Sequence, residues 1–141
     1  MNSPVVVGRD IYKTFRRDTG EIVRALNGIS LQADPGTLTA LVGPDGAGKT
    51  TLIRLACGLM TADRGELKVL GVDVSADPQQ IQSRIGYMPQ RFGLYEDLTV
   101  QENLDLYADL HGVTSDQRQT TYPQLMEMTA LGPFTLSLIH I

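Results

Sequence analysis

The residues best suited to chemistry lie in one loop, residues 43–50, whose spacing is G-x-x-x-x-G-K-T. Its glycines can adopt backbone conformations that other residues avoid, so the chain can approach phosphate oxygens closely. Lys49 supplies a mobile positive charge for β- and γ-phosphates, and Thr50 places a hydroxyl where it can ligate Mg²⁺. The loop therefore predicts a nucleoside triphosphate site, made of Gly43, Pro44, Asp45, Gly46, Ala47, Gly48, Lys49, Thr50 and Thr51.

Such a loop needs a strand before it and a helix after it. Residues 37–42 are apolar and rich in β-forming types, which predicts a strand buried on both faces. Residues 51–59 carry apolar side chains at helical spacing. The first N–H groups and the positive dipole end of that helix would face an anion in the loop. Because the predicted strand, loop and helix follow one another directly, an ordinary glycine turn that matches the motif by chance is a poor explanation of the loop sequence.

Two further regions predict β-structure. Residues 4–15 and 22–31 read as strands, separated by a polar turn at residues 16–21. We expect an antiparallel hairpin or small sheet beside the phosphate loop. Residues 66–74 alternate in polarity around Gly71, which predicts a tight hairpin.

The remaining segments are mainly helical in composition. Residues 77–83 form a predicted helix with Pro78 in its first turn, and residues 84–89 form a short β-type run. A capping box at Thr99 predicts a helix that ends near Gly112. Residues 114–131 are helical in composition but contain Pro123, so the helix either restarts near Tyr122 or is kinked there.

Composition limits the classes of protein that fit. The chain has 141 residues, a net charge of −4 and a pI near 5.0, which argues against nucleic acid as its main partner. Cys57 is the sole cysteine, so no internal disulfide can form, as suits a reducing cytoplasm. No apolar run approaches the ~20 residues of a membrane span. We expect a cytoplasmic protein that serves a membrane only through a partner.

Three segments together resemble the nucleotide-binding subunit of ABC transporters: GPDGAGKTTL at 43–52, YMPQ at 87–90 and LYEDLTVQENL at 94–104. The likeness is closest to bacterial exporter subunits that couple to a separate permease for drugs or similar amphipathic cargo, and it runs from about residue 5 to about residue 134. It implies an α/β P-loop core that binds ATP and Mg²⁺, with an N-terminal antiparallel β subdomain and the start of an α-helical subdomain. The implied divisions are 1–98, 99–134 and a non-family tail at 135–141.

The resemblance assigns roles to residues outside the phosphate loop. Phe15 matches the aromatic residue that stacks on adenine, with Tyr12 as the alternative, and Gln90 matches the glutamine that helps to hold Mg²⁺ and orient the attacking water. Asp45 stands where the family more often has Asn or Ser, and its carboxylate should repel a triphosphate unless it is screened.

The resemblance also implies protein partners. Residues 91–98 match the segment where the family docks its membrane subunit, and they present three large side chains, Phe92, Leu94 and Tyr95. Alternatively, these side chains only cover the start of the helical subdomain. A permease and a second ATP-binding subunit are the implied partners, and the implied location is the cytoplasmic face of the inner membrane.

Parts of the family's catalytic machinery have no counterpart in the sequence. There is no LSGGQ-like signature, no apolar strand ending in Asp-Glu (Walker B), and no later histidine at the switch position. The resemblance therefore implies an N-terminal fragment that binds Mg-ATP with negligible hydrolysis. The apolar tail suggests a truncated or misread gene end, with a genuine short terminal strand as the alternative.

Two other functions remain open at this stage. A P-loop small-molecule kinase would need a substrate lid and basic phosphate clamps downstream, and residues 94–110 offer none. A non-catalytic module could bind nucleotide or sequester a partner subunit. We favour the ATP-binding portion of an ABC exporter ATPase.

Overall fold

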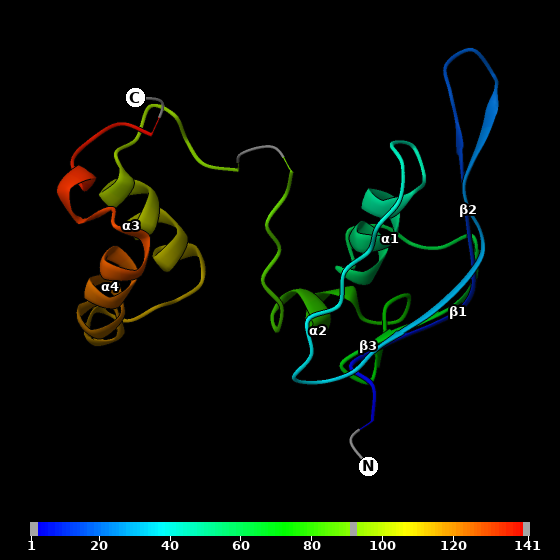
Figure 1. The fold of residues 1–141 in the computed structure, drawn as a ribbon, viewed down its shortest axis with the longest axis horizontal. Coiled ribbons are helices and arrows are strands. Elements are labelled where there is room, and N and C mark those ends of the chain that lie inside the picture. Colours follow the sequence, from blue (N-terminus) through cyan, green and yellow to red (C-terminus); the bar gives the residue numbers. More distant parts are fainter. Residues whose placement is uncertain (1–2, 91–92, 140–141) are drawn as a thin grey trace. The chain divides into compact units, whose positions relative to one another are not determined.

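The structure is a computed structural model that describes residues 3–90 and 93–139. The chain divides into two compact units, Met1–Tyr87 and Met88–Ile141. The first is an α/β unit and the second is helical (Figure 1). None of the helices in the described part of the chain is both long and apolar enough to cross a membrane.

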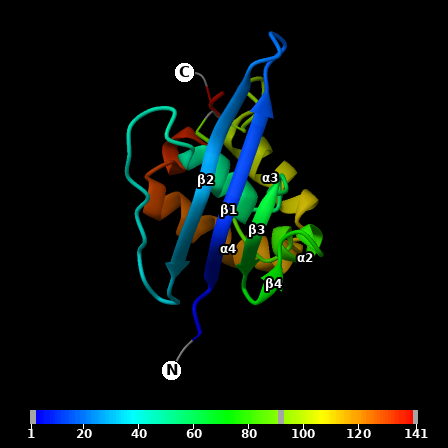
Figure 2. The same ribbon diagram turned by 90° about the vertical axis from the view of Figure 1, so that its right-hand side faces the viewer.

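The first unit is built on a four-stranded antiparallel sheet. Strands β1 (Val6–Arg16) and β2 (Ile22–Ala33) form a long hairpin, and β3 (Arg64–Val69) pairs with the other edge of β1. The short strand β4 (Val72–Asp73) completes the order β2-β1-β3-β4, which Figure 2 shows face on. The predicted antiparallel β region and the hairpin at Gly71 are thus confirmed.

Helix α1 (Lys49–Ala56) contributes Leu52 and Leu55 to the core of the first unit. Helix α2 (Pro78–Gln82) begins where the sequence predicts, because the Asp77 carboxylate caps it by accepting a hydrogen bond from the Gln80 N–H at 3.0 Å. Burial of these apolar groups against the sheet is the main force holding helices to strands. The core joins α1, α2 and the sheet through Ile11, Leu26, Leu52, Leu55, Leu67, Val69, Val74 and Ile81.

The predicted strand at residues 37–42 is wrong. This segment is an irregular coil between β2 and α1 (Figure 1), and the side chains of Leu38 and Val42 are 101% and 89% exposed. A strand of this kind is stabilised by ladder hydrogen bonds and by burial between neighbouring strands and helices. The described residues provide no neighbouring strand for it. Its composition therefore reflects a preference for β-structure, but the described residues offer no strand with which it could pair.

The β-type run at residues 84–89 is also not a strand. The segment is irregular, and Met88 is exposed. Its β-forming residues lack a pairing partner in the described chain, so local propensity alone does not produce a strand.

The second unit contains α3 (Val100–Leu110), α4 (Ser115–Thr129) and a short 3₁₀ turn, η1 (Gly132–Phe134). A capping box begins each α-helix, with Thr99 and Glu102 at α3 and Thr114 and Gln117 at α4. Helix α4 runs continuously through Pro123, so of the two alternatives the restart near Tyr122 is wrong. The exposure of that helix explains why proline is tolerated, because neighbouring water can solvate the carbonyl that loses its donor.

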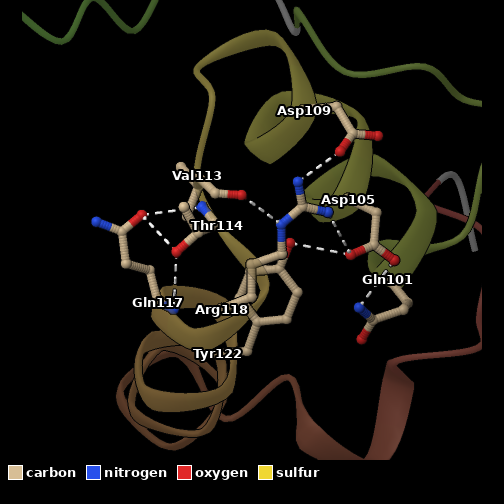
Figure 3. A network of polar contacts seen from close by, with 8 residues as sticks. All are labelled: Gln101, Asp105, Asp109, Val113, Thr114, Gln117, Arg118 and Tyr122. Carbon is tan, nitrogen blue, oxygen red and sulfur yellow. Dashed lines mark hydrogen bonds and ion pairs between the residues drawn. The ribbon is translucent and has the colours of Figure 1, made fainter.

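Helices α3 and α4 are joined by polar contacts (Figure 3). Arg118 of α4 donates to Asp109 of α3 and to the Val113 carbonyl at 2.9 Å, and it lies 3.7 Å from Asp105. The Tyr122 hydroxyl donates to Asp105 at 3.0 Å. Burial, followed by this hydrogen bond, raises the pKa of the Tyr122 hydroxyl. These polar side chains thus connect α3 to α4.

The end of the described chain contacts the start of α3. The N–H groups of Val100 and Gln101 donate to the carbonyls of Ser137 and Thr135 at 3.0 and 2.9 Å, and Leu138 forms a single antiparallel bridge with Thr99. Residues 135–139 therefore satisfy helix N–H groups that would otherwise lack protein acceptors. A mostly apolar cavity of about 640 Å³ lies between this segment, α3 and α4.

Candidate functional site: a phosphate-binding loop

The loop before α1 is closed by its own lysine. The Lys49 ammonium donates hydrogen bonds to the Gly43 and Pro44 carbonyls, both at 2.7 Å, while the Ala47 N–H donates to Pro44 O at 3.3 Å. These bonds fold the loop over the end of its own helix and place a positive charge at its centre. The ammonium can exchange these hydrogen bonds for hydrogen bonds to phosphate oxygens.

Two glycines fix the shape of the loop. Gly46 and Gly48 have φ values of 80° and 87°, in the left-handed region where side chains are disfavoured. A Cβ on Gly48 would lie 2.2 Å from the Ala25 carbonyl oxygen of β2, whereas one on Gly46 would meet nothing within 4 Å. Gly48 is therefore required where the loop passes the sheet, and Gly46 leaves open space above the loop.

The start of α1 is suited to an anion. Gly48 occupies its N-cap position without any side-chain hydrogen bond, and the first turn contains no acidic residue. The first N–H groups of an α-helix lack intrahelical acceptors and carry partial positive charge, so they attract phosphate. Thr50 and Thr51 lie in this first turn, the former exposed and the latter half-buried.

The residues present fit a bound Mg²⁺–triphosphate. The loop combines an ammonium group, free space at Gly46 and an uncapped helix N-terminus, which are complementary to phosphate oxygens. The exposed Thr50 hydroxyl is a hard oxygen ligand of the kind that Mg²⁺ takes. Asp45 is exposed in the same loop, so water can screen its carboxylate. The structure thus brings the predicted loop residues together.

The two candidate adenine-stacking residues have different surroundings. Phe15 is 39% exposed near the end of β1, and it pairs with Val23 on β2, two residues from the Ala25 carbonyl that adjoins Gly48. Tyr12 packs over Gly28, where an added Cβ would lie 2.9 Å from the Tyr12 hydroxyl. The two side chains are almost equally exposed, at 38% for Tyr12 and 39% for Phe15, so exposure does not distinguish them.

Sequence reasoning missed the carboxylate that organises this end of β1. Asp63 accepts hydrogen bonds from the Thr14 N–H at 2.6 Å, the Thr14 hydroxyl at 2.7 Å and the Lys13 ammonium at 2.9 Å. The Thr14 hydroxyl, the Lys13 ammonium and the Thr14 N–H lower the pKa of Asp63 to about 2. Because about fifty residues separate it from its partners in the sequence, no local pattern could reveal this contact.

The other predicted residues belong to the second unit. Gln90 lies exposed in the irregular segment at its start. Leu94 and Tyr95 are 40% and 57% exposed, whereas Phe92 lies outside the described residues. Sequence reasoning also missed Asn103, whose buried side chain forms hydrogen bonds with the backbone of Tyr95.

Comparison with known proteins gives consistent matches. The family described as "ABC transporter" matches residues 26–138. The chain is 47% identical over 135 residues to the probable multidrug ABC transporter ATP-binding protein YbhF of Escherichia coli, with 96% of this chain and 23% of YbhF covered. The chain thus spans about a quarter of the length of that relative.

Solved structures share the fold. The ATP-binding subunit of an ABC transporter superposes with a TM-score of 0.78 at 27% identity, over 95% of this chain and 54% of the other. The ATP-binding cassette MJ0796, in a dimeric post-hydrolysis state with ADP and Pi, gives a TM-score of 0.82 at 23% identity, over 96% of this chain and 62% of the other. These matches confirm the predicted α/β P-loop fold class.

Proposed function

Because the chain belongs to the ABC transporter family and forms part of an ATP-binding domain of that family, we propose that its 43–51 loop binds Mg-ATP. The observation that carries this proposal is the Lys49 ammonium, held at two loop carbonyls beside the uncapped N-terminus of α1. ATP and Mg²⁺ are the ligands expected for the family. The kinase alternative is not favoured, since the named relative is an ABC protein.

In this proposal each loop residue has a distinct role. Lys49 moves from its own loop carbonyls to the β- and γ-phosphates, and the N–H groups at the start of α1 receive phosphate oxygens. Thr50 ligates Mg²⁺, which neutralises phosphate charge when bound, and Gln90 helps to hold it. Phe15 stacks on the adenine.

We further propose that the full-length protein couples ATP hydrolysis to export through a membrane permease. The name of the relative YbhF, a probable multidrug ABC transporter ATP-binding protein, supports a role in transport. A second ATP-binding subunit and the permease are the proposed partners, with Leu94 and Tyr95 contacting the permease. Such contacts would hold the protein at the cytoplasmic face of the inner membrane. The exposure of Leu94 and Tyr95 supports their proposed contact with the permease.

The binding proposal is tested by titrating a fluorescent ATP analogue with Mg²⁺ into the chain and its Lys49→Ala variant. We expect saturable binding that the substitution weakens tenfold or more, about 1.4 kcal/mol. Lys68→Ala is a matched control, because it removes the same charge from an exposed position on β3. Equal affinity of the wild type and Lys49→Ala, or no binding by either, would contradict the proposal.

A further inference from the structure

Asn103 is the only buried polar residue among residues 3–90 and 93–139. Its side chain is 3% exposed and lies in the first turns of α3. Burial of an amide is unfavourable unless its donors and acceptor are all used. The partners of Asn103 therefore indicate what its position achieves.

Those partners lie in the loop before the helix. The Asn103 Oδ1 atom accepts the Tyr95 N–H at 2.9 Å, and Nδ2 donates to the Tyr95 carbonyl at 2.9 Å. Nδ2 also contacts the carbonyls of Leu98 and Thr99 at 3.3 and 3.0 Å. The amide thus binds both backbone groups of Tyr95, as a neighbouring strand would, and closes the turn that follows.

A second side chain of α3 holds the same loop one turn further along. The Tyr107 hydroxyl donates to the Gly93 carbonyl. Residues four positions apart lie on the same face of a helix, so Asn103 and Tyr107 present two adjacent anchors. Leu94 lies between the two anchored residues, and its backbone is therefore fixed on both sides.

Asn103 and Tyr107 bond to the backbone of this loop, while the side chains of Leu94 and Tyr95 remain exposed. Tyr95 is more than half exposed although its N–H and carbonyl are both bonded to Asn103. Leu94 is partly exposed and also lines the apolar cavity of the second unit. An exposed aromatic side chain on a fixed backbone is the arrangement of a preformed contact residue.

We propose that Asn103 is a positioning residue for the loop before α3, residues 93–98, which we call the partner-binding loop. It holds the backbone at Tyr95, so that Leu94 and Tyr95 are already in their binding conformation. Tyr107 is the second anchor. This inference rests on the proposed contact between this loop and a permease. Fixing a loop before binding reduces the conformational entropy lost on association, so the anchors should increase affinity without touching the partner.

Amide hydrogen exchange on the full chain tests the positioning role without a partner. Asn103→Leu keeps the branched shape and the number of side-chain heavy atoms, removes every side-chain hydrogen bond and introduces a strong helix former. Asn103→Ala removes volume as well. We expect the Tyr95 and Leu98 amides to exchange at least about tenfold faster in both variants. The amides in the middle of α3 should keep their protection.

Asn27→Ala is the matched control, because Asn27 is exposed on β2 in the first unit. It should leave Tyr95 exchange unchanged. Unchanged Tyr95 exchange in both Asn103 variants would overturn the proposal. Loss of protection throughout α3 would also overturn it, since Asn103 would then support the helix in general.

A binding measurement separates this inference from the proposed function. The probe is the set of detergent-solubilised Escherichia coli membrane proteins that immobilised full-length YbhF captures. We expect Tyr95→Ala and Asn103→Leu each to weaken binding of the chain about tenfold, and Tyr107→Phe to weaken it less. If Tyr95→Ala weakens binding and Asn103→Leu does not, the positioning role is overturned. If the wild-type chain does not bind, the permease contact fails and Asn103 loses its role in binding, whereas the exchange result still shows whether it fixes the loop.

Discussion

The ammonium of Lys13 lies 5.6 Å from the centre of the Phe15 ring. The same ammonium donates to Asp63, so a carboxylate from outside the hairpin holds the cation over the ring. A cation at this distance is attracted to the aromatic face. The ammonium thus lies over one face of the proposed adenine-stacking residue, whose side chain is 39% exposed.

Phe15→Ala should weaken nucleotide binding. Stacking of a base on an aromatic ring contributes about 1–3 kcal/mol, which corresponds to roughly a 5- to 150-fold loss of affinity. Titration with the fluorescent ATP analogue measures it. Tyr12→Ala is the control and should have little effect, because Tyr12 packs over Gly28. The reverse pattern would assign the adenine contact to Tyr12.

Gly48→Ala should destabilise α1 and the loop more than Gly46→Ala does. Both positions have positive φ, so each alanine should cost about 1–2 kcal/mol in backbone strain. At Gly48 the new Cβ would also meet the Ala25 carbonyl oxygen at 2.2 Å. Hydrogen exchange at the Leu52 and Leu55 amides measures the difference. Equal protection in the two variants would show that β2 can move away.

Asp63 should make the first unit sensitive to acid. The pKa of Asp63 is lowered from 3.8 to about 2, so its stabilising contribution is fully present above about 3.8 and is lost as pH falls through about 2. Asp63→Asn should remove this part of the pH dependence. Thermal unfolding from neutral pH down to about pH 2 measures it, with Asp18→Asn in the β1–β2 turn as the control. Identical acid profiles for wild type and Asp63→Asn would refute the assignment.

Pro123→Ala should stabilise α4. Proline inside a helix removes one hydrogen bond and crowds the preceding turn, at a cost of about 3 kcal/mol in a full helix interior. Since Pro123 is exposed, we expect a gain of about 1–3 kcal/mol. Urea unfolding followed by circular dichroism measures the gain. Pro133→Ala, in the 3₁₀ turn, is the control and should gain less. A loss of stability in Pro123→Ala would show that α4 needs the proline.

Local signals in the sequence predicted much of this fold. The Asp77–Pro78 pair, the Thr99 capping box and the turn at Gly71 each act within a few residues, so their structural outcome can be predicted from a short segment. The phosphate loop is also local, since its glycines, lysine and helix start are consecutive. The structure confirmed the two helix starts and the hairpin, whereas the phosphate-binding role of the loop stays a prediction.

The failures involve partners distant in the sequence. Residues 37–42 have the composition of a buried strand, but a strand forms only where another strand accepts its hydrogen bonds. Asp63 and Asn103 were missed for a related reason. One bonds to residues about fifty positions away, and the other has an unremarkable place in a helix until the loop folds over it.

The two hydrogen bonds from Lys49 to its own loop make nucleotide binding an exchange reaction. Each contact that the ammonium makes with a phosphate replaces a contact with the Gly43 or Pro44 carbonyl, so the number of hydrogen bonds made by Lys49 changes little when ATP enters. The heat released on binding should therefore be smaller than the new phosphate contacts alone would give. The contribution of Lys49 to affinity should then increase with the total phosphate charge of the ligand, because the electrostatic attraction grows with each added phosphate.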